Sequence, residues 1–375
     1  MTYLLGWKTQ SNVYIAADSM ITGAATSIDD QSSFGERQIC EGGNSVAERA
    51  LKIIVDEDLA IGMCGDFRAA RGLASSVIRS YRRLRDPETA LREMIVSSGP
   101  FPMKRAAQLI VAWRGEPCPR LFSFNHDGRG TLHELGYGEG VPLGSVRAMH
   151  KGMTQEPLKR LFAMEGQGSA AYLAAALGLL QSLGVHDYLL QDGVGGSFTG
   201  LCVTREGIAW QPDLLYLIDQ PGEDIWSAVA TCVRDGILIV NSTITNEPRL
   251  FVTTVNGEND LAQWAKRWGR FAQSYITNTR FDYVVLLGLT RWVVIVIEMR
   301  RTLESKMLQF HADSPAKDRI SWFELHADMI SALRRGFSKS EPDARDFRFR
   351  FEPYVARPPA GSGPSGETPR TMPRR

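Results

Sequence analysis

The chain has 375 residues, of which 43% are hydrophobic and 23% are charged, a composition typical of a folded globular protein and inconsistent with disorder over most of its length. Lys and Arg total 43 and Asp and Glu total 42, so the net charge of +1 provides no overall field that would attract nucleic acid or an anionic membrane. At roughly 150 residues per domain, the length predicts about two domains.

The first predicted element is a β-hairpin at the start of the chain. Two short apolar runs, at residues 2–7 and 13–17, are separated by a polar turn, a pattern typical of paired strands. Residues 19–49 are rich in Ser, Gly, Asp and Glu without periodicity, and we expect a long surface loop there. A second strand pair is predicted at residues 53–55 and 59–63, joined by an acidic turn.

Helices are predicted where apolar residues recur at helical spacing. The first covers residues 67–81, the second runs from Pro87 to Val96, and an Ala- and Leu-rich helix opens at Gly166 and ends near Gly184. Short strands are predicted at residues 108–113, 120–124, 131–135, 198–203 and 208–211. This order of elements predicts an α+β fold in which two antiparallel sheets carry helices on their outer faces.

The rest of the chain has no chemical signature. We expect a C-terminal α/β extension of unknown role at residues 219–355. Its predicted elements are helices at residues 224–233, 260–275 and 321–336 and an apolar strand pair at residues 283–299. Residues 356–375 form a basic tail rich in Pro, Gly and Ser, which we expect to be disordered.

Thr2 is the residue with the clearest chemical potential. Thr is small enough for the initiator Met to be removed, which would leave Thr2 with a free α-amine. Such an amine has an ordinary pKa of about 7.7–8.0, so near neutral pH part of it can accept the proton of the Thr hydroxyl. The hydroxyl can then attack an amide carbonyl. Many unrelated proteins also begin with Met-Thr, so this signal needs support from the residues that follow.

Three segments give that support. Residues 2–18, 51–54 and 61–70 resemble the first hairpin, the lysine-bearing strand start and the strand-glycine-helix junction of proteasome β-type subunits and their bacterial relatives. In that superfamily an acidic residue follows the catalytic Thr at the interval that separates Thr2 from Asp18. The opening Met-Thr-Tyr is particularly similar to the bacterial type called Anbu.

The resemblance covers somewhat over half of the chain and implies a fold and site residues. The implied fold is the four-layer αββα sandwich of N-terminal nucleophile (Ntn) hydrolases, over residues 2–218. Carried over residue by residue, Thr2 would be the nucleophile, and Lys52 would hold the amine in its neutral form. The other implied site residues are Asp18, which would pair with Lys52, Gly65, whose N–H would stabilise the oxyanion, and Asp192, a supporting aspartate.

The later part of the chain departs from the family pattern. Residues 165–172 resemble the family's Gly-Ser-Gly turn, but Gln167 stands where a supporting serine is expected, and Gly195 stands where a second serine is usual. The segment between Gln167 and Asp192 is also shorter than the family's two helices require. We therefore expect two supporting hydroxyls to be absent, which leaves open whether activity is retained.

The function implied by the resemblance is that of a threonine endopeptidase. Its substrates would be unfolded polypeptides, cleaved inside a homo-oligomeric ring or helical assembly, and an unfoldase partner is compatible with this assembly. Two alternatives remain: a non-catalytic proteasome-like ring or scaffold subunit, and an Ntn amidase that acts on a small molecule.

Other classes of site are disfavoured. The GxGxxA pattern at residues 166–171 lacks the surrounding βαβ context of a nucleotide site, and the six His residues show no metal-ligand spacing. We expect neither a cofactor nor a metal, and neither a nucleic-acid nor a membrane partner. The five Cys residues are irregularly spaced, and neither a signal peptide nor a transmembrane helix is apparent, so a cytoplasmic location is expected.

Overall fold

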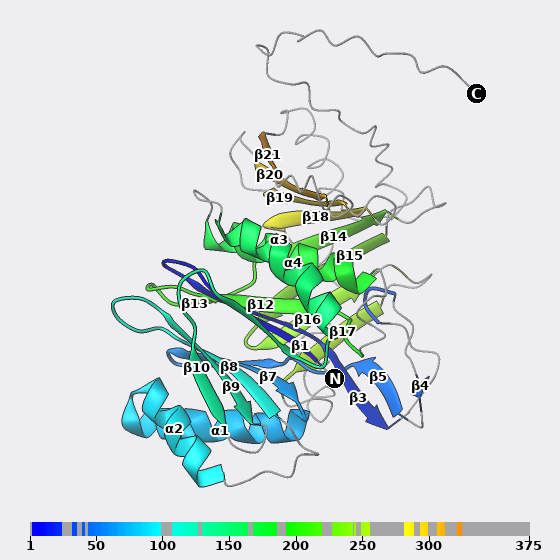
Figure 1. Cartoon of the computed structure of the whole chain (residues 1–375). Coiled ribbons are helices and arrows are strands. Elements are labelled where there is room, and N and C mark those ends of the chain that lie inside the picture. The colour runs from blue at the N-terminus through cyan, green and yellow to red at the C-terminus, as the bar shows by residue number, and fades with distance from the viewer. Residues whose placement is uncertain are drawn as a thin grey trace, which may run out of the picture.

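The computed structural model describes residues 2–24, 32–35, 40–41, 44–98, 107–126, 130–163, 168–185, 193–219, 227–242, 244, 249–255, 281–288, 293–298, 306–311 and 321–324. Within these residues the protein is a mixed α/β structure with four helices and several sheets (Figure 1). Among the described helices, none combines the length and the apolar character that would be needed to span a bilayer.

The first sheet contains the N-terminal hairpin at its centre. Its strands are, in spatial order, β11 (Gly140–Gly144), β1 (Tyr3–Lys8), β2 (Val13–Asp18), β12 (Phe198–Val203) and β13 (Ile208–Trp210). All four pairings are antiparallel. The predicted hairpin and the strands at 198–203 and 208–211 are therefore confirmed.

The second sheet is also antiparallel throughout and lies against the first. Its strands are, in spatial order, β10 (Thr131–Glu134), β9 (Arg120–His126), β8 (Ala107–Trp113), β7 (Leu59–Gly65) and β6 (Ile53–Asp56). The two sheets share a core of fully buried apolar side chains, among them Leu4 and Ile15 from the first sheet and Ile110 from the second. Gly62 fits in this interface because Leu4 and Ile15 approach its backbone closely.

Two helices, α1 (Phe67–Leu84) and α2 (Pro87–Ser98), cover the other face of the second sheet (Figure 1). Asp66 caps α1 by accepting a hydrogen bond from the Ala69 N–H at 2.9 Å. The buried residues of α1, such as Leu73 and Val77, recur at helical spacing and contact the sheet, so both predicted helices in this region are confirmed.

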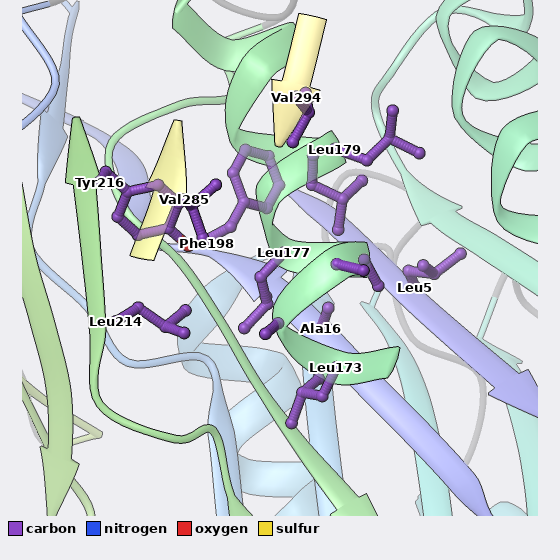
Figure 2. Packing of buried hydrophobic residues seen from close by; sticks show 14 of the residues in the cluster. Leu5, Ala16, Leu173, Leu177, Leu179, Phe198, Leu214, Tyr216, Val285 and Val294 are labelled. Atoms are coloured by element: carbon purple, nitrogen blue, oxygen red, sulfur yellow. The ribbon is translucent and has the colours of Figure 1, made fainter. Parts of the chain in front are cut away.

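The helices α3 (Ala148–Ala163) and α4 (Ser169–Val185) pack on the outer side of the first sheet. Nearly all of α4 is buried, because a further sheet covers its second face. Figure 2 shows Leu173 and Leu177 of α4 beside Ala16 of the first sheet, with Val285 and Val294 of the further sheet nearby. The helix α3 was not predicted, because its apolar residues are sparse and Pro157 interrupts the pattern.

That further sheet has eight strands. In spatial order these are β17 (Arg249–Thr254), β16 (Ile237–Ser242), β15 (Ser227–Arg234), β14 (Leu214–Asp219), β18 (Tyr283–Gly288), β19 (Val293–Glu298), β20 (Lys306–His311) and β21 (Ser321–Glu324). The pairing of β14 with β18 is parallel and the others are antiparallel. The strand pair predicted at 283–299 is present as β18 and β19.

Two helix predictions in this region are wrong where the structure describes them. Of the helix predicted at residues 224–233, residues 227–233 form most of β15, and of the helix predicted at residues 321–336, residues 321–324 form β21. Both are tertiary effects, since β15 is held between β14 and β16 and β21 is paired with β20. Residues 325–336 lie outside the described residues. The predicted helix at 260–275 and the predicted disorder at 356–375 lie outside the described residues, and the division of the chain at residue 218 stays a prediction.

The prediction of a surface loop over residues 19–49 is also wrong. A small antiparallel sheet forms there from β3 (Met20–Ala24), β5 (Asn44–Glu48) and β4 (Cys40–Glu41). Met20 and Ala47 are buried, and Phe34 packs edge-on against Tyr216 of β14. These contacts could not be predicted from the polar sequence of residues 19–49, because their apolar partners come from distant segments.

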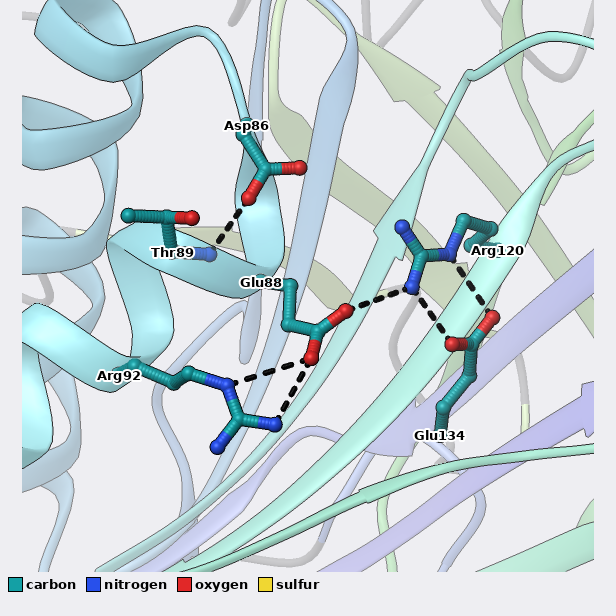
Figure 3. A network of polar contacts seen from close by, with 6 residues as sticks. All are labelled: Asp86, Glu88, Thr89, Arg92, Arg120 and Glu134. Atoms are coloured by element: carbon teal, nitrogen blue, oxygen red, sulfur yellow. Dashed lines mark hydrogen bonds and ion pairs between the residues drawn. The ribbon is translucent and has the colours of Figure 1, made fainter.

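A network of charges joins α2 to the edge of the second sheet (Figure 3). The Arg120 guanidinium binds Glu134 at 2.6 Å and Glu88 at 2.9 Å, and Glu88 also binds Arg92 at 2.8 Å. Hydrogen bonds from Arg92 and Arg120 lower the pKa of Glu88, and Arg120 lowers the pKa of Glu134. Carboxyl groups with lowered pKa values stabilise the fold above their ordinary pKa, and this contribution is lost as the pH falls through the lowered value.

We expect the variant Arg120→Met to lose about 1 kcal/mol of unfolding free energy at pH 7, a modest value because these side chains are partly exposed. The difference in unfolding free energy from the parent protein should narrow as the pH falls below the ordinary pKa of glutamate and through the lowered pKa values of Glu88 and Glu134, where these carboxyl groups become protonated. Urea unfolding at pH 7 and pH 3 measures both values, with Arg79→Met on the exposed side of α1 as the control. An equal difference at the two pH values would contradict this assignment.

Candidate active site

The topology of the first sheet brings four strand ends to one edge. Thr2 directly precedes β1, Asp18 ends β2, Ser145 follows β11 and Gly195 lies just before β12. Because all these strands are antiparallel neighbours, the start of β1 lies beside the ends of β2 and β11, and the start of β12 lies beside the end of β2. These residues, far apart in sequence, therefore meet at a single site.

The centre of this site is a buried ion pair between the two sheets. Lys52, which immediately precedes β6 of the second sheet, places its Nζ 2.7 Å from Asp18 Oδ1, and both side chains are fully buried. The N–H of Tyr3 donates to the same oxygen at 2.9 Å, and the N–H of Gly195 donates to Asp18 Oδ2 at 3.4 Å. The carboxylate thus receives the additional hydrogen bonds that a buried ion pair requires.

The electrostatics of the pair result from burial and mutual contact. Burial lowers the pKa of Lys52 and raises the pKa of Asp18, whereas the contact between the two groups opposes both shifts. The Lys52 ammonium and the Tyr3 N–H share one carboxylate oxygen. The ammonium therefore lies next to the peptide group that joins Thr2 to Tyr3.

Thr2 is held by a residue that the sequence did not single out. Its N–H donates to the Ser145 hydroxyl at 3.3 Å, and the Ser145 N–H donates to the Thr2 carbonyl at 3.1 Å. Thr2 is buried, whereas Ser145 is exposed. A Gly-Ser pair that ends a strand and precedes a helix was the available signal, at residues 144–145.

The resemblance had placed the supporting serine at position 167, where this chain has Gln. In the structure, the hydroxyl beside the Thr2 nitrogen is that of Ser145. The segment between Gln167 and Asp192 is too short for two helices, as expected, but it needs to hold only α4, because α3 lies before Gln167. Gln167 and Asp192 themselves lie outside the described residues, and the role of Asp192 stays a prediction.

Gly144 makes the close approach of Thr2 and Ser145 sterically feasible. It has a φ of +103°, and a Cβ atom there would lie 1.9 Å from the Thr2 carbonyl oxygen. Its N–H donates to Gln108 Oε1 at 2.9 Å, and its carbonyl accepts from Lys151 Nζ at 3.0 Å. Contacts from β8 and α3 thus fix the backbone that faces Thr2.

Gly65, the predicted oxyanion donor, ends β7 directly before the helix cap of α1. It is exposed and has a φ of +89°, a conformation that favours glycine.

Burial raises the pKa of the neighbouring Cys64 thiol to about 12, so this thiol is protonated at neutral pH and is a poor nucleophile. Within the described part of the chain, no three His, Cys, Asp or Glu side chains come together as a metal site.

Comparison with protein-family models gives no match, and comparison with curated protein sequences gives none either. Among solved structures, the chain is similar to eukaryotic HslV from Trypanosoma brucei. The sequence identity is 15%, the match covers 54% of this chain and 99% of that chain, and the TM-score is 0.39. Because the TM-score lies below 0.5, this likeness assigns neither a family nor a function to the chain.

Proposed function

We propose that this chain is a threonine-type Ntn hydrolase of the proteasome β type, an endopeptidase that hydrolyses amide bonds of polypeptides through an acyl-Thr2 ester. The observation that carries the proposal is the convergence of the buried Lys52–Asp18 pair and the Ser145 hydroxyl on the peptide groups of Thr2. The packing of α1 and α2 on one sheet and of α3 and α4 on the other supports a four-layer αββα domain at residues 2–218.

The reaction would begin with removal of Met1, which makes the Thr2 nitrogen an α-amine. The positive charge of Lys52, retained through its contact with Asp18, disfavours a second positive charge on that amine and keeps it basic. The amine takes the proton of the Thr2 hydroxyl as Oγ attacks the substrate carbonyl, and the Gly65 N–H stabilises the oxyanion. The C–N bond then breaks as the leaving nitrogen takes up the proton. Water, deprotonated by the same amine, hydrolyses the ester.

The assembly and partners of the protein are part of the same proposal. We infer a homo-oligomeric ring or helical assembly that admits unfolded polypeptides, with an unfoldase as a compatible partner. The non-catalytic alternative drew its support from two absent hydroxyls, and Ser145 Oγ beside the Thr2 nitrogen reduces that support. A small-molecule amidase is distinguished by comparing cleavage of unfolded casein with cleavage of small amides.

We expect the purified protein to lack Met1 by intact mass and to form one adduct with a threonine-directed epoxyketone or β-lactone probe. Peptide mapping should locate that adduct at Thr2, because only an N-terminal threonine offers both the amine and the hydroxyl. The control variant Thr2→Ala should remain unlabelled. Retention of Met1, or an adduct at another residue, would refute the proposed function.

The variant Ser145→Ala should label about 10- to 100-fold more slowly than the parent protein. The neutral amine becomes positively charged as it takes the proton of the Thr2 hydroxyl, and a hydrogen bond to a charged group contributes about 1.5–3 kcal/mol. In this variant the Thr2 nitrogen loses the Ser145 hydroxyl as its acceptor. The matched control is Ser75→Ala on the exposed side of α1, whose hydroxyl donates to the Arg71 carbonyl of its own helix. A labelling rate within twofold of the parent would contradict a role for Ser145.

A further inference from the structure

Glu48, at the end of β5, binds three segments of the chain that are remote from one another in sequence. Its Oε1 accepts hydrogen bonds from the Ser19 hydroxyl at 2.7 Å and from the Ser197 N–H at 2.9 Å. Its Oε2 accepts from the Ser33 N–H at 2.9 Å. Ser19, Ser33 and Ser197 are all buried. One carboxylate thus joins the end of β2, the turn at 32–35 and the loop before β12.

Two of these segments also supply the surroundings of Asp18. Ser19 directly follows Asp18, and its hydroxyl, which donates to Glu48, also accepts a hydrogen bond from the Ser197 N–H at 2.8 Å. The loop that contains Ser197 also contains Gly195, whose N–H reaches Asp18 Oδ2. Glu48 therefore binds both of the backbone segments that position the Asp18 carboxylate. These are Ser19, which follows Asp18, and the loop at 193–197, which contains Gly195.

The loop before β12 leaves little room for Glu48 to move. Gly196 has a φ of +68°, and a Cβ atom there would lie 2.6 Å from Ser19 Oγ and 3.0 Å from the carboxyl carbon of Glu48. Gln181 of α4 also binds this segment: it donates to the Gly196 carbonyl at 2.9 Å and accepts from the Phe198 N–H at 3.0 Å. Side chains from both β5 and α4 therefore hold the loop in place.

We propose that Glu48 is a positioning residue for the Thr2 reaction. Its carboxylate holds Ser19 and the loop at 193–197 together, so that the Gly195 N–H stays on Asp18 and Asp18 stays on Lys52. The inference rests on the proposed function, and Glu48 acts through Asp18 without contacting the substrate. None of the sequence signals at the site pointed to Glu48, which lies in the segment expected to be a loop.

The test compares Glu48→Gln with the parent protein in labelling by the β-lactone probe. Gln keeps the volume and one acceptor oxygen, but its amide donors oppose the Ser33 N–H. We expect the maximal labelling rate to fall on the order of 10- to 100-fold while the concentration for half-maximal rate changes less than threefold, because small displacements of catalytic groups reduce rate more than binding. Glu134→Gln, in the surface network of Figure 3, is the matched control and should label at the parental rate.

A double-mutant cycle separates positioning from general destabilisation. In the Asp18→Asn background, Glu48→Gln should slow labelling by less than about threefold, because the two changes act through one contact chain. Ser19→Ala is a smaller change that leaves the Glu48–Ser197 hydrogen bond in place, and it should slow labelling by roughly three- to tenfold. It replaces Glu48→Gln as the test variant if Glu48→Gln does not fold. Fully additive effects in the cycle, or parental rates in both single variants, would overturn the proposal.

A second readout does not depend on catalysis. Amide hydrogen exchange at residues 193–198 should be faster in Glu48→Gln than in the parent and unchanged in Glu134→Gln. If the parent protein is not labelled at Thr2, the proposed function fails, and the exchange experiment still tests whether Glu48 holds the loop. Unchanged exchange at 193–198 would refute the positioning role in either case.

Discussion

The variant Lys52→Met should lose Thr2 labelling by a factor on the order of 10²–10⁴ and about 3–5 kcal/mol of unfolding free energy. Methionine fills the space of the lysine stem but leaves the Asp18 carboxylate buried without its cation. The loss of stability comes from that uncompensated charge, and the loss of rate comes from an amine that becomes protonated when the Lys52 charge is absent.

A second substitution separates these two effects. In the double variant Asp18→Asn/Lys52→Met, the buried charge is removed and the Asn oxygen can still accept from the Tyr3 N–H, so most of the lost stability should return while labelling stays low. Lys159→Met, at an exposed position of α3, is the lysine control. If the probe labels Thr2 of Lys52→Met at the parental rate, or if the labelling rate recovers in the double variant, Lys52 has no role in the reaction.

The variant Gly144→Ala is expected to lose roughly 3 kcal/mol or more of unfolding free energy and about 100-fold in labelling rate. The added Cβ atom would lie 1.9 Å from the Thr2 carbonyl oxygen, so β11 and the start of β1 must separate. That separation moves Ser145 away from the Thr2 nitrogen, and the backbone of residue 144 must also keep a positive φ that alanine disfavours.

The control Gly138→Ala measures the destabilisation that comes from a positive φ alone, without a steric clash. Gly138 also has a positive φ, of +76°, but a Cβ atom there would meet nothing within 4 Å. This variant should lose only about 1–2 kcal/mol and should label at the parental rate. Thermal unfolding and probe kinetics of both variants give the comparison. If Gly144→Ala behaves like Gly138→Ala, the close approach of Gly144 to Thr2 has no functional consequence.

Much of the fold could be predicted because its signals are local. The hairpin at the start of the chain, the strands of the second sheet and the helices α1, α2 and α4 follow from apolar periodicity and turn residues, which depend only on near neighbours. The predictions failed where distant segments decide the outcome. Residues 227–233 form a strand because β14 and β16 lie on either side, and residues 20–24 and 44–48 pair across a polar segment.

The site shows the same division between local and distant information. The sequence by itself determined the candidate nucleophile Thr2, because this residue follows Met1 and carries a hydroxyl, and the resemblance carried by residues 2–18 and 51–54 implied the candidate pair Asp18 and Lys52. Only the tertiary structure decided which groups surround them. Ser145 lies 143 residues after Thr2 in the chain and reaches it through the pairing of β11 with β1. Gly195 likewise reaches Asp18 through a long-range contact, and Glu48 reaches Ser19, the residue after Asp18, since strand pairing fixes neighbours irrespective of their separation in sequence.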